Sequence, residues 1–106
     1  MVDKSGDIAE QRWWVAAIGD TLVWARLHVR ESGIAEVFDC DGRTLAYDDE
    51  TSARMALLDA DFRAWDGLDE TDAATLGFDL ASTHPPQADN DAELVLRMVQ
   101  SLGPRQ

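Results

Sequence analysis

Three glycine-containing turns at regular intervals constrain this sequence more than any other feature. Gly19-Asp20, Ser32-Gly33 and Asp41-Gly42 each separate two runs that are rich in Val, Ile, Trp, Phe or Tyr. Two-residue hairpin loops favour glycine because type I′ and II′ turns need positive φ angles, and the flanking residue types suit a pleated strand. The pattern therefore predicts a four-stranded antiparallel meander, with strands at about 12–18, 21–30, 34–40 and 43–47.

Two-residue loops would also determine which residues lie opposite one another. The resulting register pairs Ile18 with Thr21, Trp14 with Ala25, Leu27 with Phe38, Val29 with Glu36, and Phe38 with Leu45. One face of the predicted sheet is then almost wholly apolar, and its apolar members are Trp14, Ala16, Ile18, Val23, Ala25, Leu27, Val29, Ile34, Phe38, Cys40, Leu45 and Tyr47. We expect the helix that follows the meander to cover this face.

The opposite face of the predicted sheet is also partly apolar, which a solvated face would not normally be. Its two tryptophans and their aliphatic neighbours approach the size at which an exposed patch indicates an interaction site, and tryptophan and arginine are enriched at interface hot spots. The sequence therefore predicts a protein-binding surface made by Trp13, Val15, Leu22, Trp24, Arg26, His28 and Val37. In the predicted register Arg26 lies across from Asp39, as a cross-strand charge pair.

What covers this second face is left open by the sequence. A second copy of the chain is one occupant, because a self-complementary patch closes naturally into a two-fold dimer. A different protein partner is another. The alternative is that the last helix of the same chain, carried by the linker His84-Pro85-Pro86, covers the face internally.

The rest of the chain predicts three helices. Asp48-Asp49-Glu50 begins the first, at about 49–64, since acidic residues suit a helix N-terminus. Met55, Leu58 and Phe62 recur along it at helical spacing, and Leu57 and Ala53 widen this apolar stripe. The other two helices are expected at about 70–76 and 91–102. The fold class is therefore α+β, with a flexible polar N-terminal tail over 1–11, a single domain over 12–80, and a proline-containing linker with the C-terminal helix over 81–106.

Charge is the strongest compositional signal. The formal net charge is −12, and residues 39–72 alone carry eleven acidic and three basic side chains. Such a chain lacks the basic footprint that direct binding to nucleic acid or to an anionic membrane needs. An alternative function follows: an acidic inhibitor or DNA mimic that binds a basic partner through residues 48–72.

Other sequence features indicate a cytoplasmic protein. No apolar run approaches the roughly 18 residues that span a bilayer, and the polar, acidic first eleven residues do not resemble a secretory signal. The single cysteine fits a reducing compartment.

The sequence contains no clear set of catalytic, cofactor-binding or metal-binding residues. Two histidines and one cysteine offer no zinc spacing, and Arg43 and Thr44 occupy positions where a calcium loop needs a ligand and a glycine. A small enzyme that uses Asp39 and Asp41 is a further alternative. We expect a small acidic, non-enzymatic protein-interaction domain with no cofactor and no small-molecule substrate, which binds a protein partner or forms a homodimer.

Overall fold

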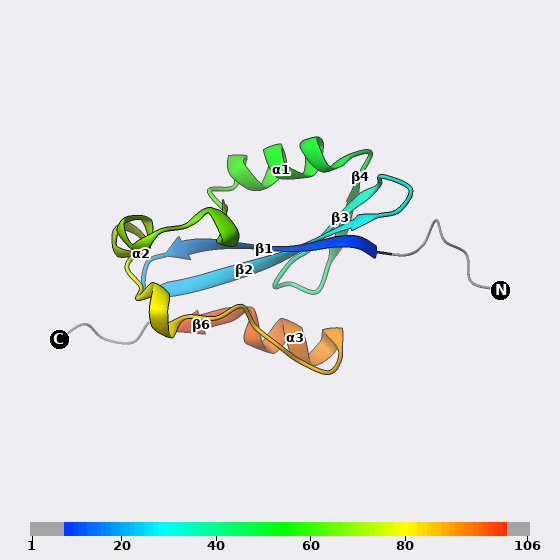
Figure 1. The fold of residues 1–106 in the computed structure, drawn as a ribbon. Coiled ribbons are helices and arrows are strands. Elements are labelled where there is room, and N and C mark those ends of the chain that lie inside the picture. Colours follow the sequence, from blue (N-terminus) through cyan, green and yellow to red (C-terminus); the bar gives the residue numbers. More distant parts are fainter. Residues whose placement is uncertain (1–7, 102–106) are drawn as a thin grey trace.

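The computed structural model describes residues 8–101, and these form an antiparallel sheet with α-helices on both of its faces (Figure 1). The strands are β1 (Ile8–Ile18), β2 (Thr21–Arg30), β3 (Ala35–Phe38), β4 (Thr44–Tyr47), β5 (Arg63–Ala64) and β6 (Val99–Ser101). The helices are α1 (Glu50–Asp59), α2 (Glu70–Leu76) and α3 (Asp91–Arg97), with short 3-10 helices η2 (Trp65–Gly67) and η3 (Leu80–Ser82). The predicted α+β class, with its four-stranded meander, is confirmed.

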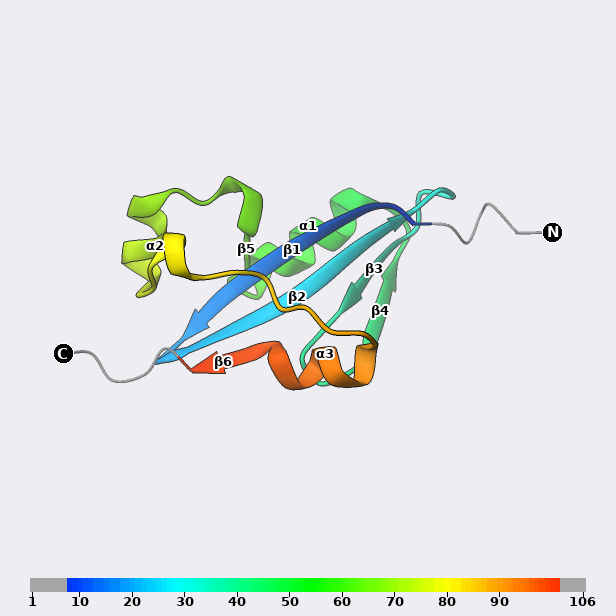
Figure 2. The ribbon, with the colours of Figure 1, turned by 60° about the horizontal axis from the view of Figure 1, so that its bottom comes forward.

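The strands lie in the order β4-β3-β2-β1-β5, and β6 joins the sheet beside β2 (Figure 2). The edge of β2 that faces away from β1 is shared between two neighbours. β3 pairs with residues 26–29 of β2, whereas β6 pairs with residues 21–23. The end of the described chain therefore completes a sheet that the first half of the chain begins.

The first hairpin has the predicted register, because Ile18 lies opposite Thr21 and Trp14 opposite Ala25. The second hairpin differs by one residue: Leu27 lies opposite Val37 rather than Phe38. Its loop has three residues, since the Arg30 N–H donates to the Ile34 carbonyl at 2.8 Å. Gly33 takes a φ of 96°, which is the left-handed position that a three-residue hairpin loop gives to glycine.

The third hairpin has the same three-residue loop. The Asp39 N–H donates to the Arg43 carbonyl at 3.0 Å, and Gly42 has a φ of 84°. Phe38 therefore lies opposite Thr44 rather than Leu45. Because a slip of one residue moves every side chain to the other face, β3 is turned over relative to the prediction, while the second slip restores β4 to its predicted face.

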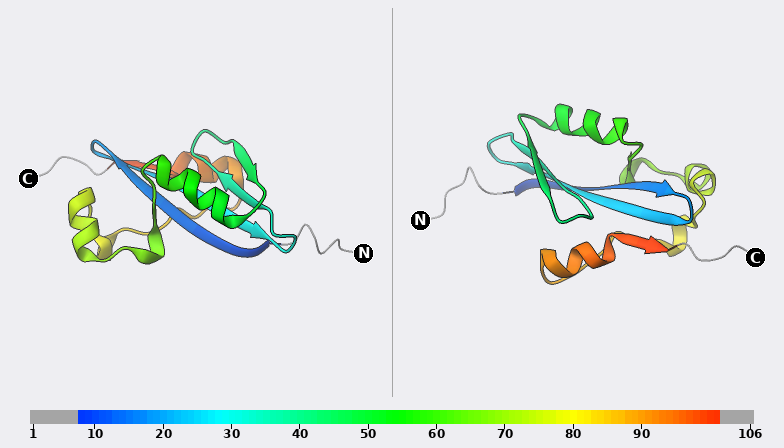
Figure 3. Two further views of the ribbon diagram at one scale, coloured as in Figure 1. Left: turned by 90° about the horizontal axis from the view of Figure 1, so that it is seen from above. Right: turned by 180° about the vertical axis from the view of Figure 1, so that it is seen from behind.

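Figure 3 shows α1 on one side of the sheet and α3 on the other, and each side carries its own core cluster. The α1-side core consists of Trp14, Ala25, Leu27, Ala35, Val37, Ala53 and Leu57. The α3-side core consists of Val15, Leu22, Trp24, Phe38, Ala73, Phe78, Leu94 and Met98. The predicted packing of the first helix on the Trp14 face is correct, but Phe38 belongs to the opposite core.

Strand β1 is longer than predicted. It begins at Ile8, within the segment 1–11 that was expected to be a tail, and a β-bulge interrupts its pairing with β2 between Ile8 and Glu10. Residues 1–7 of that segment lie outside the described part of the chain.

Helix α1 is shorter than the predicted 49–64. Asp49 is its N-cap and accepts a hydrogen bond from the Ser52 N–H at 2.8 Å. The helix ends before Asp61, whose φ of 67° is left-handed, and the chain then returns as β5, in which Ala64 pairs with Trp14. The end of the predicted helix, residues 60–64, therefore leaves the helix and includes strand β5, and the 3-10 helix η2 follows it.

The buried side of α1 also differs from the predicted stripe. Ala53 and Leu57 are buried, whereas Met55 is 61% exposed and Leu58 is 56% exposed. Of the predicted stripe, the widening residues Ala53 and Leu57 are therefore the buried ones, whereas Met55 and Leu58 face solvent.

The later elements begin where the sequence indicates. Helix α2 matches the predicted range 70–76, with a capping box between Asp69 and Asp72 and a left-handed C-cap at Gly77. Helix α3 begins at Asp91 behind an Asn90 N-cap, as predicted, but it ends at Arg97. The residues expected to form its last turn instead include strand β6, and residues 102–106 lie outside the described part of the chain.

Candidate functional site

Three of the seven residues of the predicted protein-binding surface lie in the α3-side core. Val15, Leu22 and Trp24 are buried, and Trp24 is 0% exposed. Side chains from α2, α3 and the segment after α2 pack against them within the same chain. The same chain therefore covers this face of the sheet, which is the alternative that the sequence left open. These three side chains are not at the surface.

Trp13 is partly buried at the margin of this core and begins a row of aromatic rings. Its ring lies 6.1 Å from that of Trp24 in an edge-to-face arrangement. Trp24 in turn lies 5.2 Å from Trp65, and Trp65 stacks on Phe78 at 6.1 Å. Such pairs stabilise beyond their buried area, so the row attaches η2 and the segment after α2 to the sheet.

Arg26 pairs with Asp91 of α3 and not with Asp39, so the predicted cross-strand pair is wrong. Its Nη1 donates to Asp91 Oδ1 at 2.9 Å, and its guanidinium carbon lies 4.8 Å from the centre of the Phe38 ring. The three-residue loop places Phe38, rather than Asp39, opposite Arg26. The Arg26 side chain is only 14% exposed, so it links α3 to the sheet more than it presents charge to solvent.

His28 and Val37 complete the predicted set, and they lie on opposite faces of the sheet. Val37 is in the α1-side core, which corrects its predicted place beside Trp24. His28 is half-buried, and its Nε2 donates to Gln11 Oε1 at 2.8 Å. Burial, and then the nearby charges of Arg26 and Arg30, lower the pKa of His28 below its usual value of 6.5.

Asp39 and Asp41, the pair considered for catalysis, stabilise their own hairpin. One oxygen of Asp39 accepts hydrogen bonds from the N–H groups of Asp41 at 2.9 Å and Arg43 at 3.0 Å. The Arg43 guanidinium lies 3.3 Å from Asp39 and 3.4 Å from Asp41. These contacts give both carboxylates a structural role in the turn.

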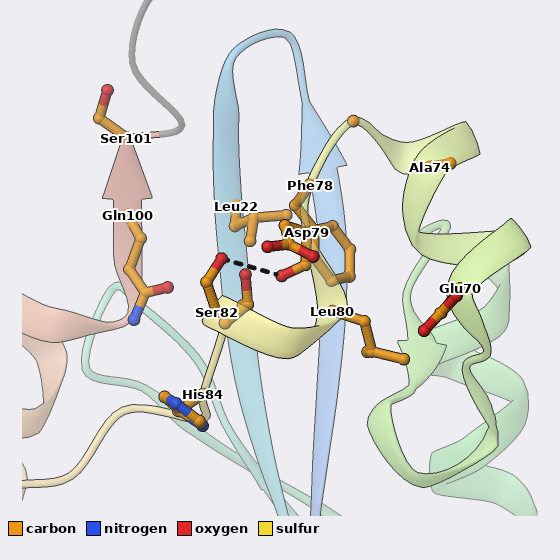
Figure 4. Close-up of a pocket in the computed structure, with 12 residues that line it drawn as sticks. Leu22, Glu70, Ala74, Phe78, Asp79, Leu80, Ser82, His84, Gln100 and Ser101 are labelled. Carbon is orange, nitrogen blue, oxygen red and sulfur yellow. Dashed lines mark hydrogen bonds between the residues drawn. The ribbon is translucent and has the colours of Figure 1, made fainter.

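A broad groove lies at the end of the sheet where β6, η3 and α2 meet (Figure 4). Its volume is about 1010 Å³, and its lining residues are Leu22, Glu70, Ala74, Gly77, Phe78, Asp79, Leu80, Ser82, Thr83, His84, Gln100 and Ser101. Gln100 and Ser101 border one side, Glu70 and Ala74 border the other, and Leu22 and Phe78 lie between them. A smaller depression that shares His84 and Gln100 continues past Pro85 and Pro86 to Arg97.

The lining of the groove is mainly polar and has acidic margins, with a smaller apolar part that includes the largely buried Leu22 and Phe78. Glu70 at the N-terminus of α2 and Asp79 before η3 supply carboxylates, whereas none of the lining residues is a lysine or arginine. Asp79 also holds η3, since its Oδ1 accepts from the Ala81 N–H at 3.3 Å, and the Ser82 hydroxyl donates to its backbone carbonyl at 3.4 Å. The arrangement suits a ligand with an apolar stem and a positively charged end.

A second pocket, of about 290 Å³, lies between the N-terminal half of β1, α1 and η2. Its charged groups are engaged with one another: Arg12 Nη1 donates to Asp66 at 2.9 Å, and Arg54 lies 3.9 Å from Glu50. The Arg54 guanidinium carbon is 5.9 Å from the centre of the Trp14 ring. This pocket therefore has a more balanced charge than the groove.

Neither a metal site nor a transmembrane helix is found among the described residues. Within residues 8–101 no three His, Cys, Asp or Glu side chains are grouped so that they could hold a metal ion. No helix in the same range is long and apolar enough to cross a membrane.

The sequence indicated the acidity of this region but not the groove. Glu70 falls within the segment 48–72 considered as an acidic surface, but Asp79, Ser82 and Gln100 had no predicted role. They come together only because β6 returns to β2, and no local pattern signals that pairing. No protein-family model matches the chain, and comparisons with curated proteins and with solved structures give no significant match.

Proposed function

We propose that the chain is a small acidic interaction domain that binds a basic segment of a partner protein in the groove between α2, η3 and β6. The observation that carries this proposal is the pair of carboxylates of Glu70 and Asp79 in a groove that has no lysine or arginine in its lining. Leu22, Phe78 and Leu80 supply the smaller apolar part of that lining. A lysine or arginine of the partner would place its aliphatic stem on this apolar part and its charge beside these carboxylates.

The groove accounts for the charge of the domain better than a continuous acidic surface over residues 48–72. Several acids of that segment are engaged in the fold: Asp49 caps α1, Asp69 and Asp72 form the capping box of α2, and Asp66 pairs with Arg12. The net charge of −12 would still attract a basic partner at long range and raise its association rate.

Titration with an oligo-arginine peptide, followed by ¹H–¹⁵N NMR, tests the proposal. We expect shifts at the amides of Leu22, Glu70, Phe78 and Gln100, and weaker binding at high salt because rim charges are screened. Glu70→Gln should weaken binding by about two- to fivefold, the range of a solvent-exposed charge pair.

Asp59→Asn is the matched control, because it removes the same charge from α1, which packs on the opposite face of the sheet. It should leave the affinity close to that of the wild type. Shifts spread evenly over the acidic residues, or equal losses in the two variants, would show nonspecific attraction and overturn the proposed site.

A further inference from the structure

Strand β4 forms an open edge of the sheet. It pairs with β3 on one side, and none of the strands described in residues 8–101 lies on its other side. Thr44, Leu45 and Ala46 are all exposed, with Leu45 at 45%. The strand Thr44–Tyr47 contains no proline, lysine or bulge, the devices that commonly block pairing at such an edge.

The hydrogen-bond pattern of the last hairpin shows which backbone groups point outward. Asp39 and Arg43 form a hydrogen-bonded pair, with N to O at 3.0 Å. Because such pairs alternate along an antiparallel ladder, the backbone groups of Leu45 and Tyr47 point toward β3. Those of Thr44 and Ala46 therefore point away from the sheet and are available to another strand.

We infer that β4 pairs antiparallel with β4 of a second copy of this chain, about a two-fold axis at Ala46. In this register Ala46 exchanges both backbone hydrogen bonds with Ala46 of the second copy. Leu45 then lies across from Tyr47 on the α1 side of the sheet. The chain bends at Asp48 and Asp49 after β4 ends at Tyr47, so the backbone pairing is centred on Thr44–Tyr47.

Charge complementarity argues for a second copy in this orientation. Arg43 precedes β4, and Asp48, Asp49 and Glu50 follow it. Antiparallel pairing about Ala46 brings Arg43 of each copy, which also lies near Asp39 and Asp41 of its own hairpin, toward the acidic segment 48–50 of the other copy. Parallel pairing would place the acidic ends side by side. An alternative antiparallel register would pair Leu45 with Leu45 of the second copy. It would place Arg43 opposite Tyr47 and lose this charge complementarity.

The interface is independent of the groove proposed above, since β4 contributes none of the groove residues. It also differs from the surface that the sequence suggested for self-association, because Val15, Leu22 and Trp24 are buried in the chain's own core. A strand of four residues makes a small interface, so we expect a weak, concentration-dependent dimer.

Sedimentation equilibrium with two variants of Ala46 tests whether the edge pairs. The wild type should approach twice its monomer mass as the concentration rises. Ala46→Pro removes the outward N–H without removing a bond of the fold, since proline is tolerated on the solvent side of an edge strand, and it should remain monomeric with an unchanged circular-dichroism spectrum. Ala46→Val keeps the N–H and should still dimerise.

Cysteine crosslinking tests the register, even if the proline variant fails to fold. In a Cys40→Ser background, Ala46→Cys should form a disulfide-linked dimer on mild oxidation, because facing hydrogen-bonded residues lie about 5.5 Å apart at Cα. Thr44→Cys is the matched control and should not, since the two copies of Thr44 would be about 14 Å apart. A wild type that stays monomeric up to about 1 mM, or equal crosslinking of the two variants, would overturn the inference.

Discussion

The backbone N–H of Trp24 donates to the carbonyl oxygen of Met98 at 2.8 Å, and both side chains are fully buried. This bond continues the ladder in which β6 pairs with β2. It fixes the end of α3 against the face that carries Trp24, so the C-terminal segment contributes to both the sheet and the core. The segment predicted as a linker and helix is therefore part of the domain's structure.

Met98→Ala should lower the free energy of unfolding by about 2–5 kcal/mol, the range for truncating a buried methionine. The loss arises because the fully buried side chain belongs to the α3-side core, together with Trp24 and Leu94. Urea denaturation followed by tryptophan fluorescence measures it. Leu96→Ala, at a side chain that is 80% exposed, should change stability by less than about 0.5 kcal/mol, and equal effects would contradict this account of the core.

The strands and the starts of the later helices could be predicted because their signals are local. The loop lengths could not, because a glycine before a strand suits either the second position of a two-residue loop or the third position of a three-residue loop. Around Gly33 the sequence does not distinguish a two-residue from a three-residue loop, because Val37 and Phe38 are both apolar. Each face of the sheet has a core, and each core contains one of these two residues.

The buried side of α1 was ambiguous for a related reason. Apolar residues occur on both sides of this helix, and the larger ones, Met55 and Leu58, suggested the wrong side. Ala53 and Leu57, which only widen the predicted stripe, are the residues that pack in the α1-side core. The groove was beyond prediction because its residues meet only through the pairing of β6 with β2, which is a long-range contact.

The orientation of α1 can be tested with two truncations. Leu57→Ala should destabilise the fold by about 2–4 kcal/mol because it opens a cavity in the α1-side core. Met55→Ala should change stability by less than about 0.5 kcal/mol, since this side chain is largely in solvent. Thermal or urea unfolding of both variants decides, and a larger loss for Met55 would restore the predicted stripe.

Asp91→Asn should cost up to about 1 kcal/mol, because it weakens the pairing of α3 with a largely buried Arg26. The hydrogen bond from Arg26 lowers the pKa of the Asp91 carboxyl below its usual 3.8. The stabilisation is therefore present above that unfolded value and is lost as the pH falls through the lower folded value. Urea denaturation should show that the unfolding free energies of the wild type and Asp91→Asn differ near neutral pH and converge in acid. Glu93→Gln, at an exposed neighbour on the same helix, should show no comparable loss near neutral pH.

His28 should make stability depend on pH in the interval just below about pH 6.5. Burial lowers its pKa in the folded state, Arg26 and Arg30 lower it further, and Asp91 and Glu36 oppose them. The unfolded chain therefore binds the proton first as the pH falls below about 6.5, so the folded state loses stability across that interval. His28→Gln keeps a group that can hydrogen-bond to Gln11 and removes the titration, and its unfolding free energy should vary less over the interval than that of the wild type. NMR titration of the His28 ring checks the cause directly, and a pKa at or above 6.5 would contradict it.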